Sequence, residues 1–96
     1  MSVTFAVLLW PVAGREAELH AYEDDVLRLL DDHGGRVVTR ARSVDTDGSQ
    51  PLETQLISFD EDAGFDAYMS DPRRTAVTDR RDACVARTQL WRVDLG

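Results

Sequence analysis

The chain contains no lysine and no asparagine, and it has a single cysteine. Without lysine, the N-terminus is the only amine available for Schiff-base chemistry. One cysteine, Cys84, excludes an internal disulfide and any zinc site built from several cysteines. Its apolar neighbours indicate a small buried residue rather than a nucleophile. The only two histidines, His20 and His33, lie thirteen residues apart, so we expect no metal site.

Positive charge and long apolar runs are also scarce. Eleven arginines face eighteen acidic residues, which gives a net charge of −7 and a pI near 4.6. That balance argues against nucleic acid as a partner. The apolar stretch 1–10 has no basic segment before it and is followed by Pro11. We therefore expect neither a signal peptide nor a membrane span, and we expect a cytoplasmic protein.

What the chain does contain is typical of one globular domain over residues 1–96, with 43% hydrophobic and 30% charged residues. Apolar periodicity, together with glycine, proline and aspartate as boundary residues, predicts the elements. The expected strands are 3–10, 36–44, 52–59 and 87–94. The expected helices run from 15 to the Gly34-Gly35 pair, from Asp60 to about 70, and from 72 to about 85, the last capped by Asp71.

This order is the ferredoxin-like β-α-β-β-α-β arrangement, an α+β fold with a four-stranded antiparallel sheet and helices on one face. Its usual topology places the first and third strands at the centre. The distribution of charge agrees, because charged residues protect the edges of a sheet. The two expected central strands carry only Glu53, whereas the two expected edge strands carry five arginines: Arg36, Arg40, Arg42, Arg87 and Arg92.

The first strand has apolar residues on both of its faces, and helices can cover only one of them. The other row would stay in contact with water in a monomer, which a patch of that size disfavours. Two sheets that pack face to face around a two-fold axis remove the problem. We therefore expect a homodimer formed through the sheet face.

Four segments carry a resemblance to a known group of proteins. They are QLISF at 55–59, AGFDAYM at 63–69, DPRR at 71–74 and RRDA at 80–83. With these segments, nearly the whole chain resembles the dimeric α+β barrel superfamily, the group around the antibiotic-biosynthesis monooxygenases and neighbouring uncharacterised families. The resemblance implies a homodimer whose ligand pocket lies between the sheet and the helices of each subunit.

The resemblance implies several activities, because the superfamily includes oxygenases that need no cofactor, haem-degrading enzymes, isomerases and cyclases. The haem-degrading branch resembles an Asn-Trp-His set, and the absence of asparagine argues against it here. Our leading hypothesis is an enzyme without a cofactor, a monooxygenase or an isomerase or cyclase, acting on a small aromatic or polyketide-like compound. The alternative is a non-catalytic ligand-binding or homodimerisation module.

Two residues are candidates for catalysis. Arg80 falls within the apolar stripe of the last helix, where it could hold a carboxylate or enolate oxygen. A structural reading gives it instead a salt bridge to Asp66 or Asp79, or a place in the dimer interface. His20 lies at the rim of the first helix's stripe and could act as a general base, or it could be a solvated surface residue.

Three aromatic residues are candidates for a ligand pocket. Tyr22 and Tyr68 fall within apolar stripes, and a buried tyrosine hydroxyl needs a partner. They could orient a ligand in a cavity between helices and sheet, or they could be ordinary core residues bonded to the backbone. Trp10 ends the first strand and could form a wall of the pocket; Trp10 and Trp91 could equally seal a dimer core. His33, at the end of the first helix, is expected to interact with the helix dipole.

Overall fold

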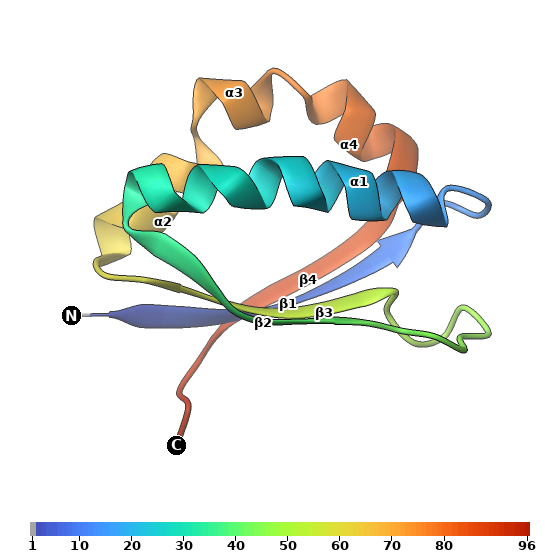
Figure 1. The fold of residues 1–96 in the computed structure, drawn as a ribbon, viewed down its shortest axis with the longest axis horizontal. Helices are drawn as coiled ribbons and strands as arrows, with labels where there is room; N and C mark the ends of the chain where they lie inside the picture. Colours follow the sequence, from blue (N-terminus) through green and yellow to red (C-terminus); the bar gives the residue numbers. More distant parts are fainter. Residues whose placement is uncertain (1) are drawn as a thin grey trace.

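The computed structural model describes residues 2–96 and follows the predicted order of elements (Figure 1). The strands are β1 (Val3–Pro11), β2 (Gly35–Arg42), β3 (Glu53–Phe59) and β4 (Val85–Val93). The helices are α1 (Glu16–Leu27), α2 (Asp62–Met69), α3 (Pro72–Thr75) and α4 (Thr78–Cys84), and a 3-10 segment, η1 (Arg28–His33), continues α1. Among the described residues, no helix is both long and apolar enough to cross a membrane.

The four strands form an antiparallel sheet in the order β2-β3-β1-β4. The expected central strands are therefore central, and the five arginines of the prediction all lie on the two edge strands. In the register, Ala6 pairs with Leu56 of β3 on one side and with Trp91 of β4 on the other. Because neighbours in register share a face, these three side chains lie on the same side of the sheet.

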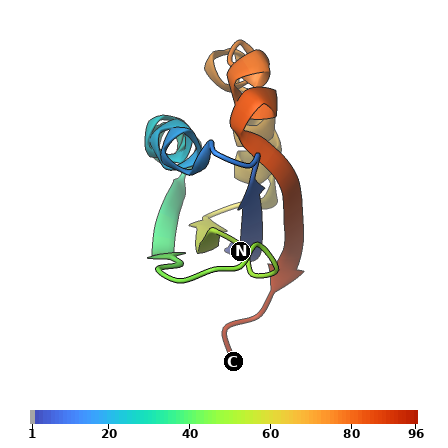
Figure 2. The same cartoon turned by 90° about the vertical axis from the view of Figure 1, so that its right-hand side faces the viewer.

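All the helices cover one face of the sheet, and the opposite face carries none (Figures 1 and 2). Alternate residues of β1 point into the core between the two layers; they include Val3, Val7 and Leu9, which are nearly inaccessible to solvent. Helix α1 contributes Leu19, Tyr22 and Val26, and the remaining core residues include Leu30, Ile57, Phe59, Tyr68 and Cys84. We call the helix-free side the outer sheet face.

The helical layer differs from the prediction in two places. The first helix tightens into η1 after Leu27 before Gly34 ends it with a left-handed φ of 68°. The helix expected from 72 to about 85 is broken into α3 and α4 at Ala76 and Val77, where the Val77 backbone leaves the helical region (φ −107°, ψ 23°). This break changes which way the arginines of α4 point.

Of the two predicted N-cap residues, one is confirmed and the other prediction is wrong. Asp71 caps α3 as expected, since its side chain accepts a hydrogen bond from the Arg73 amide at 2.8 Å, with Pro72 at the first helical position. Asp60 does not cap α2, because that helix starts one residue later with Glu61 at its cap position. The Asp60 carboxylate instead lies 3.5 Å from the guanidinium of Arg36.

Gly64 lets α2 pack directly on the end of η1. A Cβ atom at this position would lie 2.3 Å from the backbone carbonyl oxygen of His33. Helix propensity alone favours alanine over glycine by about 1 kcal/mol. We expect Gly64→Ala to do the reverse and lower the free energy of unfolding by about 2 kcal/mol, because the backbone of η1 has to move. Urea unfolding measures this, with Ala67→Gly on the exposed side of α2 as the propensity control; a stabilised Gly64→Ala protein contradicts the packing.

Candidate binding pocket

A small pocket of about 180 Å³ lies between the helical layer and the sheet. Its floor comes from three strands and is formed by Val7, Leu9, Gln55, Ile57, Thr88 and Leu90. Its roof comes from the helices and is formed by Glu23, Leu27, Tyr68, Met69, Arg74 and Arg81. The pocket therefore combines an apolar floor with two guanidinium groups, one carboxyl group and one phenol.

Arg74, from α3, is the cation of this pocket that has an unpartnered buried nitrogen. Its Nε atom is buried and has no hydrogen-bond partner, and no other buried side-chain nitrogen or oxygen among residues 2–96 is in that position. One terminal nitrogen reaches the carbonyl oxygen of Met69 at a long 3.5 Å, and the guanidinium lies 5.2 Å from the centre of the Tyr68 ring. An unsatisfied donor on a charged group is costly, and the side chain that carries it is one of those that line the pocket.

Arg81 and Tyr68 complete the polar part of the roof. Arg81 of α4 donates a hydrogen bond to the Thr88 hydroxyl at 2.6 Å, which ties the helix to β4. Burial raises the pKa of Tyr68 to about 12, although the neighbouring Arg74 works against that shift. The phenol therefore stays protonated at neutral pH and can donate a hydrogen bond.

Glu23 is the carboxyl group of the pocket and is almost fully buried, with 7% of its surface exposed. The side-chain amide of Gln55 donates a hydrogen bond to its Oε1 at 2.9 Å. Burial raises the pKa of Glu23, and the negative charge of Glu53 adds to the effect, while Gln55, Arg40 and Arg74 oppose it. A buried carboxyl group with a raised pKa holds its proton more tightly than a solvated one and is a stronger base when ionised.

Behind Glu23 lies a second buried carboxylate, Glu53 of β3, whose side chain has no exposed surface. Arg40 binds it through two nitrogens, at 2.7 and 2.8 Å, and also contacts Asp24 at 2.6 Å. Gln55 donates to Glu53 at 2.9 Å with the same amide nitrogen that it offers to Glu23. Burial alone would raise the pKa of Glu53, but the hydrogen bonds from Arg40, His20 and Gln55 outweigh it and lower the pKa.

The sequence-predicted catalytic residues do not line this pocket. His20 lies beside it at the edge of α1, where its Nδ1 is 2.5 Å from Glu53 Oε2, so it is neither a pocket base nor simply solvated. Arg80 does not point into the core: its side chain is 43% exposed, pairs with Asp25 of α1 at 2.7 Å and lies over the Tyr22 ring. The partners predicted by the structural reading, Asp66 and Asp79, are also wrong. The break before α4 rotates Arg80 outward and turns Arg81 inward.

The predicted pocket aromatics separate as well. Tyr68 lines the pocket, whereas Tyr22 is buried in the core and is not among the lining residues. Trp10 lies at a different, open concavity of about 760 Å³ beside the loop between β2 and β3. There its Nε1 donates to the Ser49 carbonyl at 3.2 Å, and Arg87 stacks 4.4 Å from its ring.

His33 contacts a side chain rather than only the end of its helix. Its Nε2 lies 2.7 Å from Asp71 Oδ2, which connects η1 to the cap of α3. Hydrogen bonds from Arg73 and His33 hold the pKa of Asp71 well below its ordinary value. Within the part of the chain that the structure describes, no three His, Cys, Asp or Glu side chains are grouped so that they could hold a metal ion.

Two polar residues of the pocket, Glu23 and Arg74, were not singled out by sequence reasoning. Glu23 looked like one more acid on an acidic helix, and Arg74 like one member of a basic pair. The available signal was Glu53, a charge on the inward face of a central strand two residues before Gln55. A buried charge at such a position requires a polar network around it.

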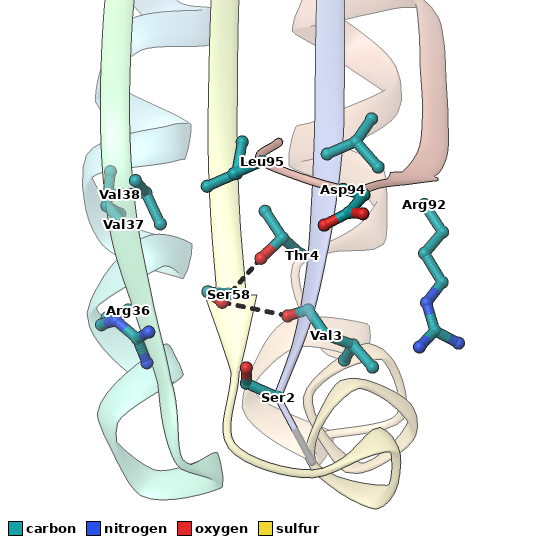
Figure 3. A pocket seen from close by; sticks show the side chains of 11 residues that line it. Ser2, Val3, Thr4, Arg36, Val37, Val38, Ser58, Arg92, Asp94 and Leu95 are labelled. Carbon is teal, nitrogen blue, oxygen red and sulfur yellow. Dashed lines mark hydrogen bonds between the residues drawn. The ribbon is translucent and has the colours of Figure 1, made fainter.

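The outer sheet face presents a second kind of surface. Its central apolar residues are Ala6, which is buried, Leu8, Leu56 and Val93, which are half-buried, and Trp91, which is 46% exposed. At one end a shallow concavity of about 820 Å³ has hydroxyl groups at its centre. Figure 3 shows Thr4 and Ser58 joined by a hydrogen bond of 2.9 Å, with Arg36 on one side and Arg92 on the other.

Comparison with known proteins gives structural matches but no close relatives. No family model matches the chain, and no curated protein matches it. Among solved structures, a dabb family protein with a ferredoxin-like fold from Mesorhizobium loti is similar (19% identity, TM-score 0.69, 99% of this chain and 98% of that one). A dimeric ferredoxin-like protein of unknown function from Bacteroides fragilis is similar too (11%, 0.73, 98% and 96%).

A third similar structure has a described activity. It is SnoaB, a cofactor-independent oxygenase from Streptomyces nogalater (14% identity, TM-score 0.70, 99% of this chain and 95% of that one). At these identities the matches establish the fold, so the predicted ferredoxin-like architecture is confirmed. The activity of any one neighbour does not follow from the fold.

Proposed function

We propose that the chain is a small-molecule enzyme without a cofactor, which removes a proton from a compact organic acid in the pocket between helices and sheet. The observation that carries the proposal is the buried, unpartnered Nε of Arg74, which lines the same pocket as the buried carboxyl group of Glu23. One group is placed to accept a proton, and the other is placed to hold the anion that results. The fold shared with a cofactor-independent oxygenase supports this class of reaction.

The proposed step is a proton transfer. The ionised Glu23 carboxylate takes the proton from a C–H or O–H bond of the ligand, and the electron pair stays on the ligand as an enolate or phenolate. Arg74 holds the developing oxyanion by charge-assisted hydrogen bonds, and the Tyr68 hydroxyl can donate a further one. Glu23 thus takes the role that the sequence suggested for His20, and Arg74 that of Arg80.

Two outcomes are open to such an anion. In an isomerisation, Glu23 returns the proton to a different carbon of the ligand. In a monooxygenation, molecular oxygen oxidises a CH₂ group to a carbonyl: one oxygen atom stays in the product, and the other leaves as water with the two hydrogens. Both need only the ligand, oxygen in the second case, and side chains of the pocket.

The size of the pocket limits the ligand. A cavity of about 150 Å³ is enough for benzene in an engineered protein, and this pocket has about 180 Å³. We therefore propose a molecule of about one ring rather than a large polyketide. The same small volume, below the roughly 300 Å³ of typical ligand sites, favours the second candidate, a module that binds a small molecule without transforming it.

We also propose that two copies pair through the outer sheet face. The supporting observations are the apolar row that includes the half-buried Leu56 and the exposed Trp91, and the lack of any helix of residues 2–96 on that face. A structural neighbour is described as dimeric. In this arrangement each subunit keeps its own pocket, because the pocket lies on the opposite side of the sheet.

Arg74→Met tests the anion site. The probe is 4-nitrophenol, which is of one-ring size and whose absorption reports its ionisation. We expect the wild-type protein to bind it as the phenolate, and we expect Arg74→Met to weaken binding about 10- to 100-fold through loss of a charged hydrogen bond. Spectrophotometric titration measures both the ionisation state of the bound probe and its dissociation constant.

The matched control is Arg28→Met, which removes an arginine whose side chain is 78% exposed and should leave binding unchanged. Arg80→Met tests the residue predicted from sequence, and because Arg80 lies outside the pocket we expect wild-type affinity. Equal binding by wild type and Arg74→Met overturns the anion site. Binding that ionises the probe without any turnover of enolisable one-ring compounds favours the non-catalytic module.

A further inference from the structure

Four side chains form a continuous hydrogen-bonded network from the edge of α1 to the pocket. His20 Nδ1 lies 2.5 Å from Oε2 of Glu53, and the amide nitrogen of Gln55 lies 2.9 Å from both Glu53 Oε1 and Glu23 Oε1. The imidazole is 22% exposed, whereas Glu53 and Gln55 are completely or almost completely buried. The outer end of the network therefore exchanges protons with solvent, and its inner end is the carboxyl group of the pocket.

Glu23 is the only member of this hydrogen-bonded network that takes part in the proposed reaction. The reaction alone gives no role to His20, Glu53 or Gln55. A buried ion pair made for stability needs Glu53 and Arg40 alone. Here the same carboxylate also binds a titratable imidazole and an amide that is shared with a second carboxyl group. Two carboxyl groups that share one donor compete for it, and the charge on one changes the proton affinity of the other.

We propose that Gln55 is the positioning residue of the pocket and that His20, acting through Glu53 and Gln55, tunes the proton affinity of Glu23. The proposal rests on the function assigned above, in which Glu23 is the proton acceptor. It gives His20 an indirect role in place of the direct one suggested by the sequence.

The direction of the coupling follows from charge. When His20 is protonated, its positive charge offsets that of the Glu53 carboxylate, so Glu23 ionises more readily. When His20 loses its proton, Glu53 repels a negative charge on Glu23 more strongly, and Glu23 holds its proton more tightly. As the pH rises, loss of the proton from His20 therefore opposes loss of the proton from Glu23. The titration of Glu23 is spread over a wider pH range.

Other charged groups around Glu23 act as a constant background over this range. The titratable and charged groups that lie near Glu23 or share its pocket come from α1, β2, β3, α2, α3 and α4, and they are Tyr22, Arg40, Glu53, Tyr68, Arg74, Arg81 and Cys84. Burial raises the pKa of Tyr22 and that of Cys84, so both stay neutral at low and neutral pH. The arginines keep their charge, Tyr68 has a pKa of about 12, and the pKa of Glu53 is lowered. His20 is the remaining titratable side chain of the network.

The test measures the titration of Glu23 in the ligand-free protein, by NMR of ¹³C-labelled glutamate side chains between pH 4 and pH 9. We expect the wild-type titration curve of Glu23 to show a second inflection at the pH where the His20 ring resonances titrate. The change in charge on His20 should shift the apparent pKa of Glu23 by on the order of 0.5 pH unit. His20→Gln should reduce the curve to one step. His33→Gln, the same change in the histidine bound to Asp71, should leave both steps in place.

A second variant tests the positioning role. Gln55→Leu removes the donor to the ionised form of Glu23, so we expect its titration midpoint to rise by about 1 pH unit, with Gln50→Leu in the surface loop as control. If Gln55→Leu does not fold, the His20 and His33 variants decide the question alone. A single-step wild-type curve, or equal effects of the two histidine substitutions, overturns the proposal. Because no ligand is present, this result is independent of 4-nitrophenol binding, whose failure would instead count against the proposed function.

Discussion

Glu53→Leu is expected to lower the free energy of unfolding by about 3–5 kcal/mol. The substitution removes a carboxylate that has no exposed surface and leaves Arg40, His20 and Gln55 without their shared partner. Removing one member of a buried ion pair is strongly destabilising because an uncompensated charge remains buried. The side chain of Arg40 is only 18% exposed, so it cannot easily recover its hydration.

The double variant Glu53→Leu/Arg40→Met separates loss of the pair from creation of a buried charge. Replacing both partners with apolar side chains of similar volume is often close to neutral, so we expect it to regain most of the lost stability. Glu18→Leu is the control, because it breaks an exposed pair with Arg15 at 2.8 Å, which should contribute less than about 1 kcal/mol. Urea unfolding of the four proteins completes the measurement, and a Glu53→Leu loss no larger than that of Glu18→Leu contradicts the expectation.

The pKa of Glu53 also determines whether the free energy of unfolding rises or falls with pH. The pKa of Glu53 in the folded protein is lowered below its ordinary value of 4.5. Its stabilising contribution is therefore complete above that value and is lost as the pH falls through the folded pKa. We expect the difference in stability between wild type and Glu53→Leu to shrink below about pH 4.5. Glu23 has the opposite sign, because its raised pKa favours the folded state at low pH and this benefit disappears as the pH rises.

The sheet was predictable from sequence because its strands carry signals that act locally. Charges on edge strands and apolar residues on central strands identified the order of the strands, and the structure confirms it. The side of the edge strand on which each arginine lies was not predictable. Arg40 turns inward to bind Glu53, while Arg36 pairs with Asp60 at the surface. That choice depends on which residue of β3 stands opposite, a register that is set by the whole fold.

The site was less predictable because it depends on one break in the helical layer. A continuous helix over 72–85 places Arg80 in the apolar stripe, and this is why the sequence pointed to it. The backbone of Val77 interrupts the helix. Arg74, before the break, and Arg81, after it, both line the pocket, and Arg80 reaches Asp25. Neither Ala76 nor Val77 is a helix breaker by propensity, and Val77 packs against the hydrophobic core at the break.

Trp91→Asp is expected to convert the protein from a dimer to a monomer. Trp91 lies on the outer sheet face next to Ala6, with 46% of its surface exposed in the single chain. In a face-to-face pair of sheets this indole is buried, and large aromatic side chains at such positions dominate the energy of association. A carboxylate there would have to be desolvated without a partner, which we expect to weaken the dimer at least 100-fold.

Size-exclusion chromatography with light scattering measures the change. Wild type should have about twice the chain mass of 10.8 kDa, and Trp91→Asp should have the mass of one chain at the same micromolar concentration. Val44→Asp introduces the same charge at a loop residue that is 93% exposed, and it should remain dimeric. Circular dichroism checks that both variants are folded. A wild-type protein that stays monomeric at high micromolar concentration would contradict the pairing, and the outer sheet face would then need another partner, because its apolar row is too continuous to be an ordinary solvated surface.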